Sequence, residues 1–272
     1  MTHLERVAIF KALHARDGIF LIPNPWDVGT ARMLAALGFE ALATTSAGHA
    51  FSLGQGDNTL TREATLTHAR QIVDATDLPV SADLGNGFGD RPEAVAETIR
   101  LAGATGLAGA SVEDATYEDA QPVYDVQHAV DRVRAASEAA HGLPVPLVLT
   151  ARAENLIVGR PDLADTIARL QAFQDAGADV LYAPGLLTLS DVRAVVSSVD
   201  RPVNVLAGIA GARFTMTDLA SAGVRRVSTG SALARAALGT FLRAALEMRD
   251  RGTFGYVDRA ASSKEIAALL SD

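Results

Sequence analysis

Three ionisable residues follow three strand-like segments in the middle of the sequence, and their chemistry is complementary. Asp83 comes after one apolar run, Glu113 after the next and Arg152 after a third. Where such runs are neighbouring parallel strands, their carboxyl ends meet, and two carboxylates placed there repel each other unless a cation or a proton lies between them. The pattern therefore predicts a divalent metal ion held by Asp83 and Glu113, with Arg152 beside it.

The candidate metal is magnesium, with manganese as the alternative. Mg²⁺ takes only one or two carboxylates directly and keeps several waters, which leaves positions for substrate oxygens. Arg152 offers a planar fork for a carboxylate, and the turn Ser46-Ala47-Gly48 offers its amides and a hydroxyl to the same anion. These features are typical of a site for a small chelating 2-oxo acid, in which we assign Asp83, Glu113 and Arg152 as catalytic.

The elements that must position these residues alternate along the chain. Segments rich in Val, Ile and Leu alternate with amphipathic helical segments, which is the pattern of βα units around a parallel sheet. We predict an α/β protein with one (β/α)8 TIM-barrel domain over residues 1–272, in which reactive groups stand at the carboxyl ends of strands. The eight predicted strands are 19–22, 40–45, 78–82, 106–112, 146–151, 179–183, 202–206 and 226–229.

Glycine and proline mark the ends of the helices between these strands. Gly38, Gly103, Gly177 and Gly223 each stand shortly before a strand and suit the position that ends a helix. Helix starts are predicted at Thr61 and at the prolines of 91–92 and 160–162. An extra N-terminal helix, 4–15, and a C-terminal helical extension over 231–272, with a helix at 262–270, lie outside the repeat. We expect them to cap the barrel or to reach a neighbouring subunit.

Composition and charge argue against several other classes of protein. A net charge of −8 argues against nucleic-acid binding, and the pair Arg225-Arg226 is expected only to flank a strand. The chain has no cysteine, so disulfides, thiolate zinc sites and cysteine nucleophiles are excluded. It also has no apolar run of about 20 residues and no visible targeting signal, so we expect a cytoplasmic protein without membrane contact.

Competing sites have weaker support in the sequence. A doubly wound nucleotide-binding sheet would need Gly-x-Gly-x-x-Gly after the first strand, but the glycine-rich segment 85–89 follows the third. Schiff-base chemistry would fall to Lys11 or Lys264, and both lie on terminal helices. His49, after the serine turn, is a candidate acid or base, whereas the other histidines, His14 and His68 among them, are expected on solvated helix faces.

Five segments carry motifs that resemble the isocitrate lyase and phosphoenolpyruvate mutase superfamily, and the resemblance as a whole spans nearly the whole chain. The resemblance implies a magnesium ion bound directly by Asp83, with Asp57 and Glu113 acting largely through waters. It also implies a 2-oxo acid held by the metal, by Arg152 and by the turn at Ser46. The segments are 23–28 (Pro-Asn-Pro-Trp-Asp-Val), 45–57 (from Thr-Ser-Ala-Gly to Gln-Gly-Asp), 81–89 (Ser-Ala-Asp-Leu-Gly-Asn-Gly-Phe-Gly), 112–114 (Val-Glu-Asp) and 150–154 (Thr-Ala-Arg-Ala-Glu).

The resemblance extends to substrate contacts and to assembly. We assign Trp26 in the first motif and Asn204 at the end of the seventh strand as further substrate-binding residues. Members of the superfamily break a bond next to the oxo acid, and metal and arginine stabilise the enolate that remains. Similar chains form homo-oligomers that exchange a C-terminal helix, so we expect a dimer or a tetramer.

Departures from the family pattern narrow the reaction. Gly85 stands where the metal-binding strand usually has a second aspartate, and the loop 113–122 lacks the Lys-x-Cys-Gly-His of isocitrate and methylisocitrate lyases. The Lys and Asn of the phosphonate enzymes are missing from the same loop, and Pro184 stands where the mutases have histidine. The leading hypothesis is a carbon–carbon lyase or decarboxylase for a small 2-oxo acid such as oxaloacetate or one like 2-oxoglutarate. The alternatives are a non-catalytic 2-oxo acid binding protein and a phosphonopyruvate-processing enzyme.

Overall fold

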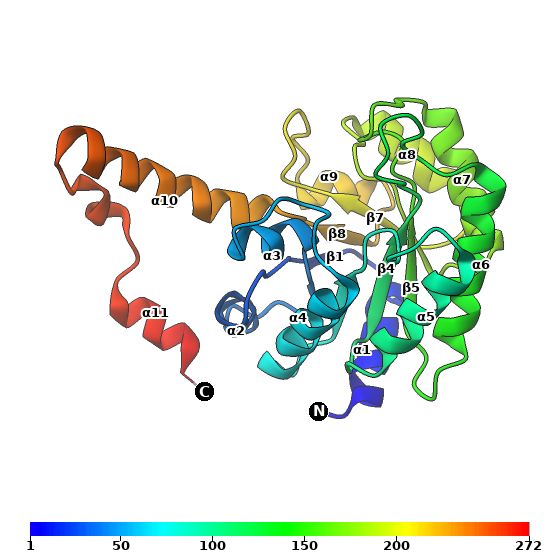
Figure 1. Ribbon diagram of the computed structural model, residues 1–272, viewed down its shortest axis with the longest axis horizontal. Coiled ribbons are helices and arrows are strands. Elements are labelled where there is room, and N and C mark those ends of the chain that lie inside the picture. Colours follow the sequence, from blue (N-terminus) through cyan, green and yellow to red (C-terminus); the bar gives the residue numbers. More distant parts are fainter. Residues whose placement is uncertain (272) are drawn as a thin grey trace.

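The predicted (β/α)8 barrel is confirmed by a computed structural model, which describes residues 1–271 (Figure 1). All strand pairs are parallel, in the order β1-β8-β7-β6-β5-β4-β3-β2. A backbone hydrogen bond of 3.1 Å from Ala43 N to Pro23 O links the two edges, so the barrel is nearly closed. The strands are β1 (Phe20–Ile22), β2 (Leu42–Ala43), β3 (Val80–Asp83), β4 (Gly109–Glu113), β5 (Val148–Arg152), β6 (Val180–Tyr182), β7 (Val203–Leu206) and β8 (Arg226–Ser228).

The strand ends differ slightly from the predicted ones, and the difference matters for the site. Asp83, Glu113 and Arg152 are the last residues of β3, β4 and β5 rather than the residues that follow them. Glu113 pairs in register with Arg152, whereas Asp83 pairs with Ser111. The ladder hydrogen bonds therefore fix the backbones of all three residues at the same end of the barrel.

Helices cover the outside of the barrel, and most of the predicted boundary signals are confirmed. Thr61 caps its helix by accepting from Ala64 N, and Pro92 stands at the first turn of the next one. Gly38, Gly177 and Gly223 have positive φ after their helices, but Gly103 is the last residue of a helix and Gly106 has the positive φ instead. The helices are α2 (Val28–Ala36), α3 (Ser46–Ser52), α4 (Arg62–Ala75), α5 (Pro92–Gly103), α6 (Val126–His141), α7 (Leu163–Asp175), α8 (Leu189–Ser197) and α9 (Met216–Ser221).

The N-terminal helix α1 (His3–Ala15) closes the amino-terminal end of the barrel, as one of the two predicted roles requires. Val7, Phe10 and Leu13 are buried in one cluster with Phe20 and other strand residues. The expectation that helical histidines face solvent is wrong for His14 and His68, which are 8% and 4% exposed. Both lie on the inner faces of their helices, where the barrel rather than water surrounds them.

The C-terminal extension leaves the barrel. Figure 1 shows α10 (Ala232–Arg251) projecting away from the strands and the chain then turning back through a short 3-10 helix (Gly255–Arg259), so that α11 (Ser263–Leu270) contacts α2. Leu238, Phe241 and Leu242 on α10 are exposed in a single chain. Exchange of this extension between subunits remains a prediction. Among the described residues, no helix is long and apolar enough to cross a lipid bilayer.

Candidate active site

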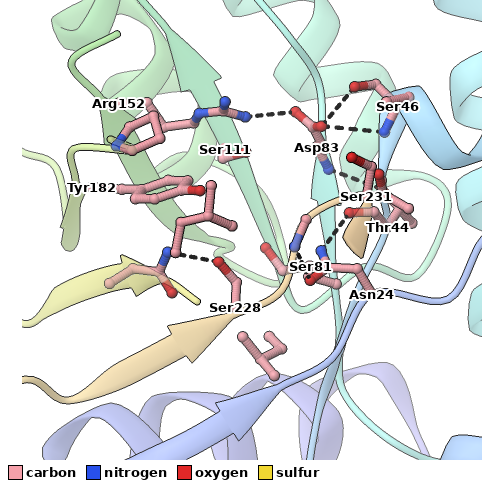
Figure 2. Close-up of a pocket in the computed structure, with 18 of the residues that line it drawn as sticks. Asn24, Thr44, Ser46, Ser81, Asp83, Ser111, Arg152, Tyr182, Ser228 and Ser231 are labelled. Atoms are coloured by element: carbon pink, nitrogen blue, oxygen red, sulfur yellow. Dashed lines mark hydrogen bonds and ion pairs between the residues drawn. The ribbon is translucent and has the colours of Figure 1, made fainter. Parts of the chain in front are cut away.

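A cavity of about 210 Å³ opens at the carboxyl ends of the strands. Figure 2 shows Arg152 and Ser46 pointing toward Asp83 from opposite sides, with Tyr182 and Ser228 below Arg152 in the same view. Ser46, Asp57, Asp83 and Arg152 all line the cavity, so the fold brings together four residues that are far apart in the sequence. This is the end of a (β/α)8 barrel where active sites occur.

Arg152 forms the centre of a buried charge cluster. Its Nη1 lies 3.0 Å from Asp83, its Nη2 3.0 Å from Glu113, and its Nε 2.8 Å from Glu154. Burial opposes the charge of Arg152, but the three carboxylates raise its pKa well above the ordinary value. The guanidinium is thus a permanent cation, and its fork faces protein carboxylates; a direct contact with substrate stays a prediction.

Asp83 accepts hydrogen bonds on both carboxylate oxygens. Oδ1 accepts from Arg152 Nη1 at 3.0 Å and Gly85 N at 3.3 Å, and Oδ2 accepts from Ser46 N at 3.2 Å and Ser46 Oγ at 2.8 Å. Ser46 is the first residue of α3, which Thr45 caps by accepting from Gly48 N. The serine turn therefore directs one amide and one hydroxyl at Asp83, and a second amide is used by the cap.

Asp57 and Asp83 share the hydroxyl of Ser46, and these oxygen atoms show whether the site fits a metal ion. Ser46 Oγ lies 2.8 Å from Asp83 Oδ2 and 3.3 Å from Asp57 Oδ1, but its one hydrogen satisfies only one of these oxygens at a time. Loss of solvent around Asp57, and next the charge of Asp83, raise the pKa of Asp57. Asn58 N also donates to Asp57 Oδ1 at 2.9 Å, and Arg152 pairs with Asp83. Two neighbouring carboxylates and a hydroxyl on one cavity wall form a hard-oxygen set that fits Mg²⁺.

Glu113 shares the Arg152 guanidinium with Asp83, but it lies outside the cavity wall that Asp57 and Asp83 form. It lies against Arg152, hydrogen-bonds Tyr117 and does not line the cavity. Burial raises the pKa of Glu113, and the Arg152 charge opposes that rise. Within residues 1–271, no group of three or more histidine and acidic side chains is arranged to hold a metal by itself. The predicted metal role of Glu113 would therefore have to act from outside the cavity wall.

Tyr117 explains why position 85 is glycine. The backbone at Gly85 has φ +53°, and a Cβ there would lie 2.6 Å from Tyr117 Oη. That hydroxyl accepts a hydrogen bond of 3.0 Å from Asn86 N. The loop tyrosine thus occupies the space that the second aspartate of the family motif would need.

The other predicted site residues divide into two groups. Ala47 and Asn204 line the cavity, whereas Gly48 and Trp26 do not. The Trp26 carbonyl instead hydrogen-bonds the His68 ring at 3.0 Å. His49, the candidate acid or base, stacks on the same His68 ring at 3.7 Å and is also absent from the cavity wall.

Arg226 and Tyr182 are cavity residues that sequence reasoning missed. Arg226 begins β8, as in the predicted strand 226–229, but it does more than flank that strand: it is 5% exposed and lines the cavity. Arg225 is half-buried and contacts the Gly18 carbonyl. Tyr182 is buried under Arg152, whose guanidinium carbon lies 5.1 Å from the ring centroid. The available signal was the period of two in β8, which puts 226 on the same face as Ser228.

The family model described as phosphoenolpyruvate phosphomutase matches residues 10–249. The chain belongs to this family. Among its relatives, a Corynebacterium glutamicum protein named probable 2-methylisocitrate lyase 1 is 30% identical over 98% of this chain and 89% of that protein. The oxaloacetate decarboxylase of a Bradyrhizobium strain is 29% identical over 84% of this chain and 78% of its own length.

Solved structures of the superfamily agree with this fold. A Burkholderia cenocepacia protein provisionally classed as a lyase or mutase superposes with a TM-score of 0.96, at 55% identity, over 99% of this chain and 97% of the other. A phosphonopyruvate hydrolase, solved with oxalate and Mg²⁺, superposes with a TM-score of 0.84 at 25% identity over 99% and 95%. The matched family is named for a mutase, its named relatives here include lyases and a hydrolase, and the chain is an enzyme of this superfamily, of the lyase class.

Proposed function

We propose that this chain cleaves a carbon–carbon bond between C3 and its outer substituent in a small 2-oxo acid, one carbon away from the oxo group, with decarboxylation of oxaloacetate as the simplest form. The observation that carries the proposal is the pair Asp57 and Asp83, which shares one hydroxyl proton on the cavity wall next to the permanent cation Arg152. The relatives named oxaloacetate decarboxylase and 2-methylisocitrate lyase support the same class of substrate.

Asp83 and Asp57 would hold a magnesium ion, with Ser46 between them. When bound, this ion polarises the oxo group of the substrate as a Lewis acid. The magnesium in the phosphonopyruvate hydrolase structure supports this assignment. Glu113 would orient the site indirectly, because its contact is to Arg152 at 3.0 Å.

The chain's own residues supply the rest of the chemistry. In decarboxylation the bond between C3 and the distal carboxylate breaks, CO2 leaves, and the electron pair forms the enolate of C2 and C3. Arg152 stabilises the charge that develops there without a base acting on the substrate. Burial raises the pKa of Tyr182 to about 12, so its hydroxyl stays protonated and is available as a hydrogen-bond donor to the enolate. A proton then returns to C3 from solvent.

Turnover of oxaloacetate in the presence of Mg²⁺ tests this proposal. Asp83→Ala should lower kcat by at least 100-fold, which is the usual scale for losing electrostatic stabilisation of a transition state. Asp77→Ala is the matched control, because Asp77 is an exposed acid that pairs with the N-terminus and Arg6 outside the cavity. Equal turnover by the wild type and Asp83→Ala would remove the proposal.

The same preparation separates the alternatives. A non-catalytic binding protein would bind 2-oxoglutarate or pyruvate in calorimetry and release no product detectable by mass spectrometry. A phosphonopyruvate-processing enzyme would release phosphate from phosphonopyruvate or convert it. Neither alternative has a structural observation of its own, and we keep both as outcomes of the assay.

We also propose that the chain forms a homo-oligomer. The exposed apolar side chains of α10, among them Phe241 at 70% exposure, support this proposal because such surfaces are usually covered in an assembly. Light scattering on the purified protein measures the mass directly, and a monomer at all concentrations would contradict it.

A further inference from the structure

Arg226 is a buried cation in the barrel interior that has no acidic partner. Its side chain is 5% exposed, and no carboxylate among residues 1–271 forms an ion pair with it. Arg152, on the same cavity, contacts three carboxylates. A buried charge without a counter-charge is strongly destabilising, so a protein keeps one where a ligand or another group needs it.

Neutral residues hold Arg226 in a fixed orientation. Its Nε donates to Asn204 Oδ1 at 2.9 Å, and its Nη1 lies 3.4 Å from His14 Nε2. His14 Nδ1 lies 2.8 Å from the Phe10 carbonyl, so that nitrogen carries the hydrogen and Nε2 is the acceptor. Neither contact uses Nη2. The guanidinium is therefore anchored along one edge and keeps its full charge.

Arg226 also lines the cavity together with Asn204 and Ser228. Asn204 Nδ2 donates to Ser228 Oγ at 2.9 Å, so these side chains form a small polar floor. Arg226 is the first residue of β8 and Ser228 the last, so the guanidinium stands toward the amino-terminal side of the site. Asp57 and Asp83 lie on the opposite, carboxyl-terminal side. The cavity thus has a negative mouth and a positive floor.

We propose that Arg226 is a subsite for the distal carboxylate of a dicarboxylic 2-oxo acid. This inference rests on the proposed function, because it assumes that the oxo-acid end of the ligand lies near Asp83. The distal carboxylate enters the cavity, and its negative charge compensates the guanidinium that the protein leaves unpaired. Asn204 positions the guanidinium by fixing Nε. The site consequently selects dicarboxylic over monocarboxylic 2-oxo acids.

Calorimetry with matched ligand pairs tests the subsite without requiring turnover. 2-Oxoglutarate and 2-oxopentanoate have the same chain length, and they differ only in a distal carboxylate or methyl group. The wild type should bind 2-oxoglutarate at least tenfold more tightly. Arg226→Met should weaken the binding of 2-oxoglutarate about 10- to 100-fold, which is the scale of a charge-assisted hydrogen bond. The same variant should change the affinity for 2-oxopentanoate by less than about twofold.

Two further variants complete the experiment. Arg225→Met removes the neighbouring half-buried arginine, which does not line the cavity, and should leave both affinities unchanged. Arg226→Lys keeps the charge and should retain part of the preference if the methionine variant does not fold. Equal binding of the two ligands by the wild type, or equal weakening of both by Arg226→Met, would overturn the subsite. Failure of the wild type to bind any 2-oxo acid would overturn the proposed function as well.

Discussion

His14 makes the stability of this protein depend on pH, and the structure gives the size of the effect. The ring lies edge-on to Phe10 and Phe20, with centroid distances of 4.7 and 5.0 Å, and beside the Arg226 guanidinium. Burial, and next the positive charge of Arg226, lower the pKa of His14 from 6.5 to about 3. The folded protein therefore keeps His14 neutral at any pH above about 3.

The unfolded chain binds a proton at His14 below pH 6.5, and the folded protein does not. Proton binding thus favours unfolding as the pH falls from 6.5 toward 3, and the stabilisation is fully present above 6.5. Between pH 8 and pH 5 the free energy of unfolding should fall by about 2 kcal/mol from this residue alone. His68 adds to the fall, because burial and then His49 lower its pKa to about 4.

Urea unfolding followed by circular dichroism at pH 5 and pH 8 measures this loss. The glutamine of His14→Gln keeps a donor and an acceptor but does not titrate. The free energy of unfolding of this variant should therefore fall by about 2 kcal/mol less than that of the wild type between pH 8 and pH 5. His128→Gln, which removes a half-buried histidine on α6, should keep the full wild-type loss. An identical loss in the wild type and His14→Gln would refute the reasoning.

Two other predictions concern the scaffold around the site. Gly85→Ala should lower the free energy of unfolding by about 1–2 kcal/mol, because its φ is +53° and its Cβ would meet Tyr117 Oη, and Tyr117→Phe should recover part of that loss. An unchanged free energy of unfolding for Gly85→Ala, measured by urea unfolding, would argue against the clash. Arg169→Met should lower the free energy of unfolding by about 3–5 kcal/mol, because the change removes the guanidinium that lies 3.0 Å from the buried Asp114 carboxylate. Adding Asp114→Asn should cost less than the sum of the single changes, and strict additivity would contradict this account.

The repeat of strands and helices was predictable from local patterns. Alternating apolar runs, Pro92 at a helix start and Gly177 after a helix depend on backbone preferences that act within a few residues. The predicted strand ends differ from the observed ones by a residue or two, because the last hydrogen bond of each strand depends on the neighbouring strand. That small shift placed Asp83 and Arg152 inside the strands and fixed their backbones.

Residue types alone predicted a site at the carboxyl ends of β3 and β5, since acids and an arginine recur there. Only the tertiary structure decided how their charges are arranged. Arg152 contacts both Asp83 and Glu113, the two residues that adjacency in the sheet suggested as joint metal ligands. Which carboxylate a guanidinium contacts depends on side chains from three strands, and no local pattern contains that information.

The sequence by itself determined the fold and the chemistry of the barrel mouth, because periodicity and strand-end residues are local properties. The tertiary structure alone decided the floor of the cavity. In the sequence, Arg226 is one of two adjacent arginines at the start of a strand. Its position at the cavity floor depends on β1 pairing with β8 and on α1 placing His14 next to its guanidinium. The burial of Arg226, and its lack of an ion pair among the described residues, depend on how the whole chain packs. The positive floor of the cavity could therefore be identified only from the tertiary structure.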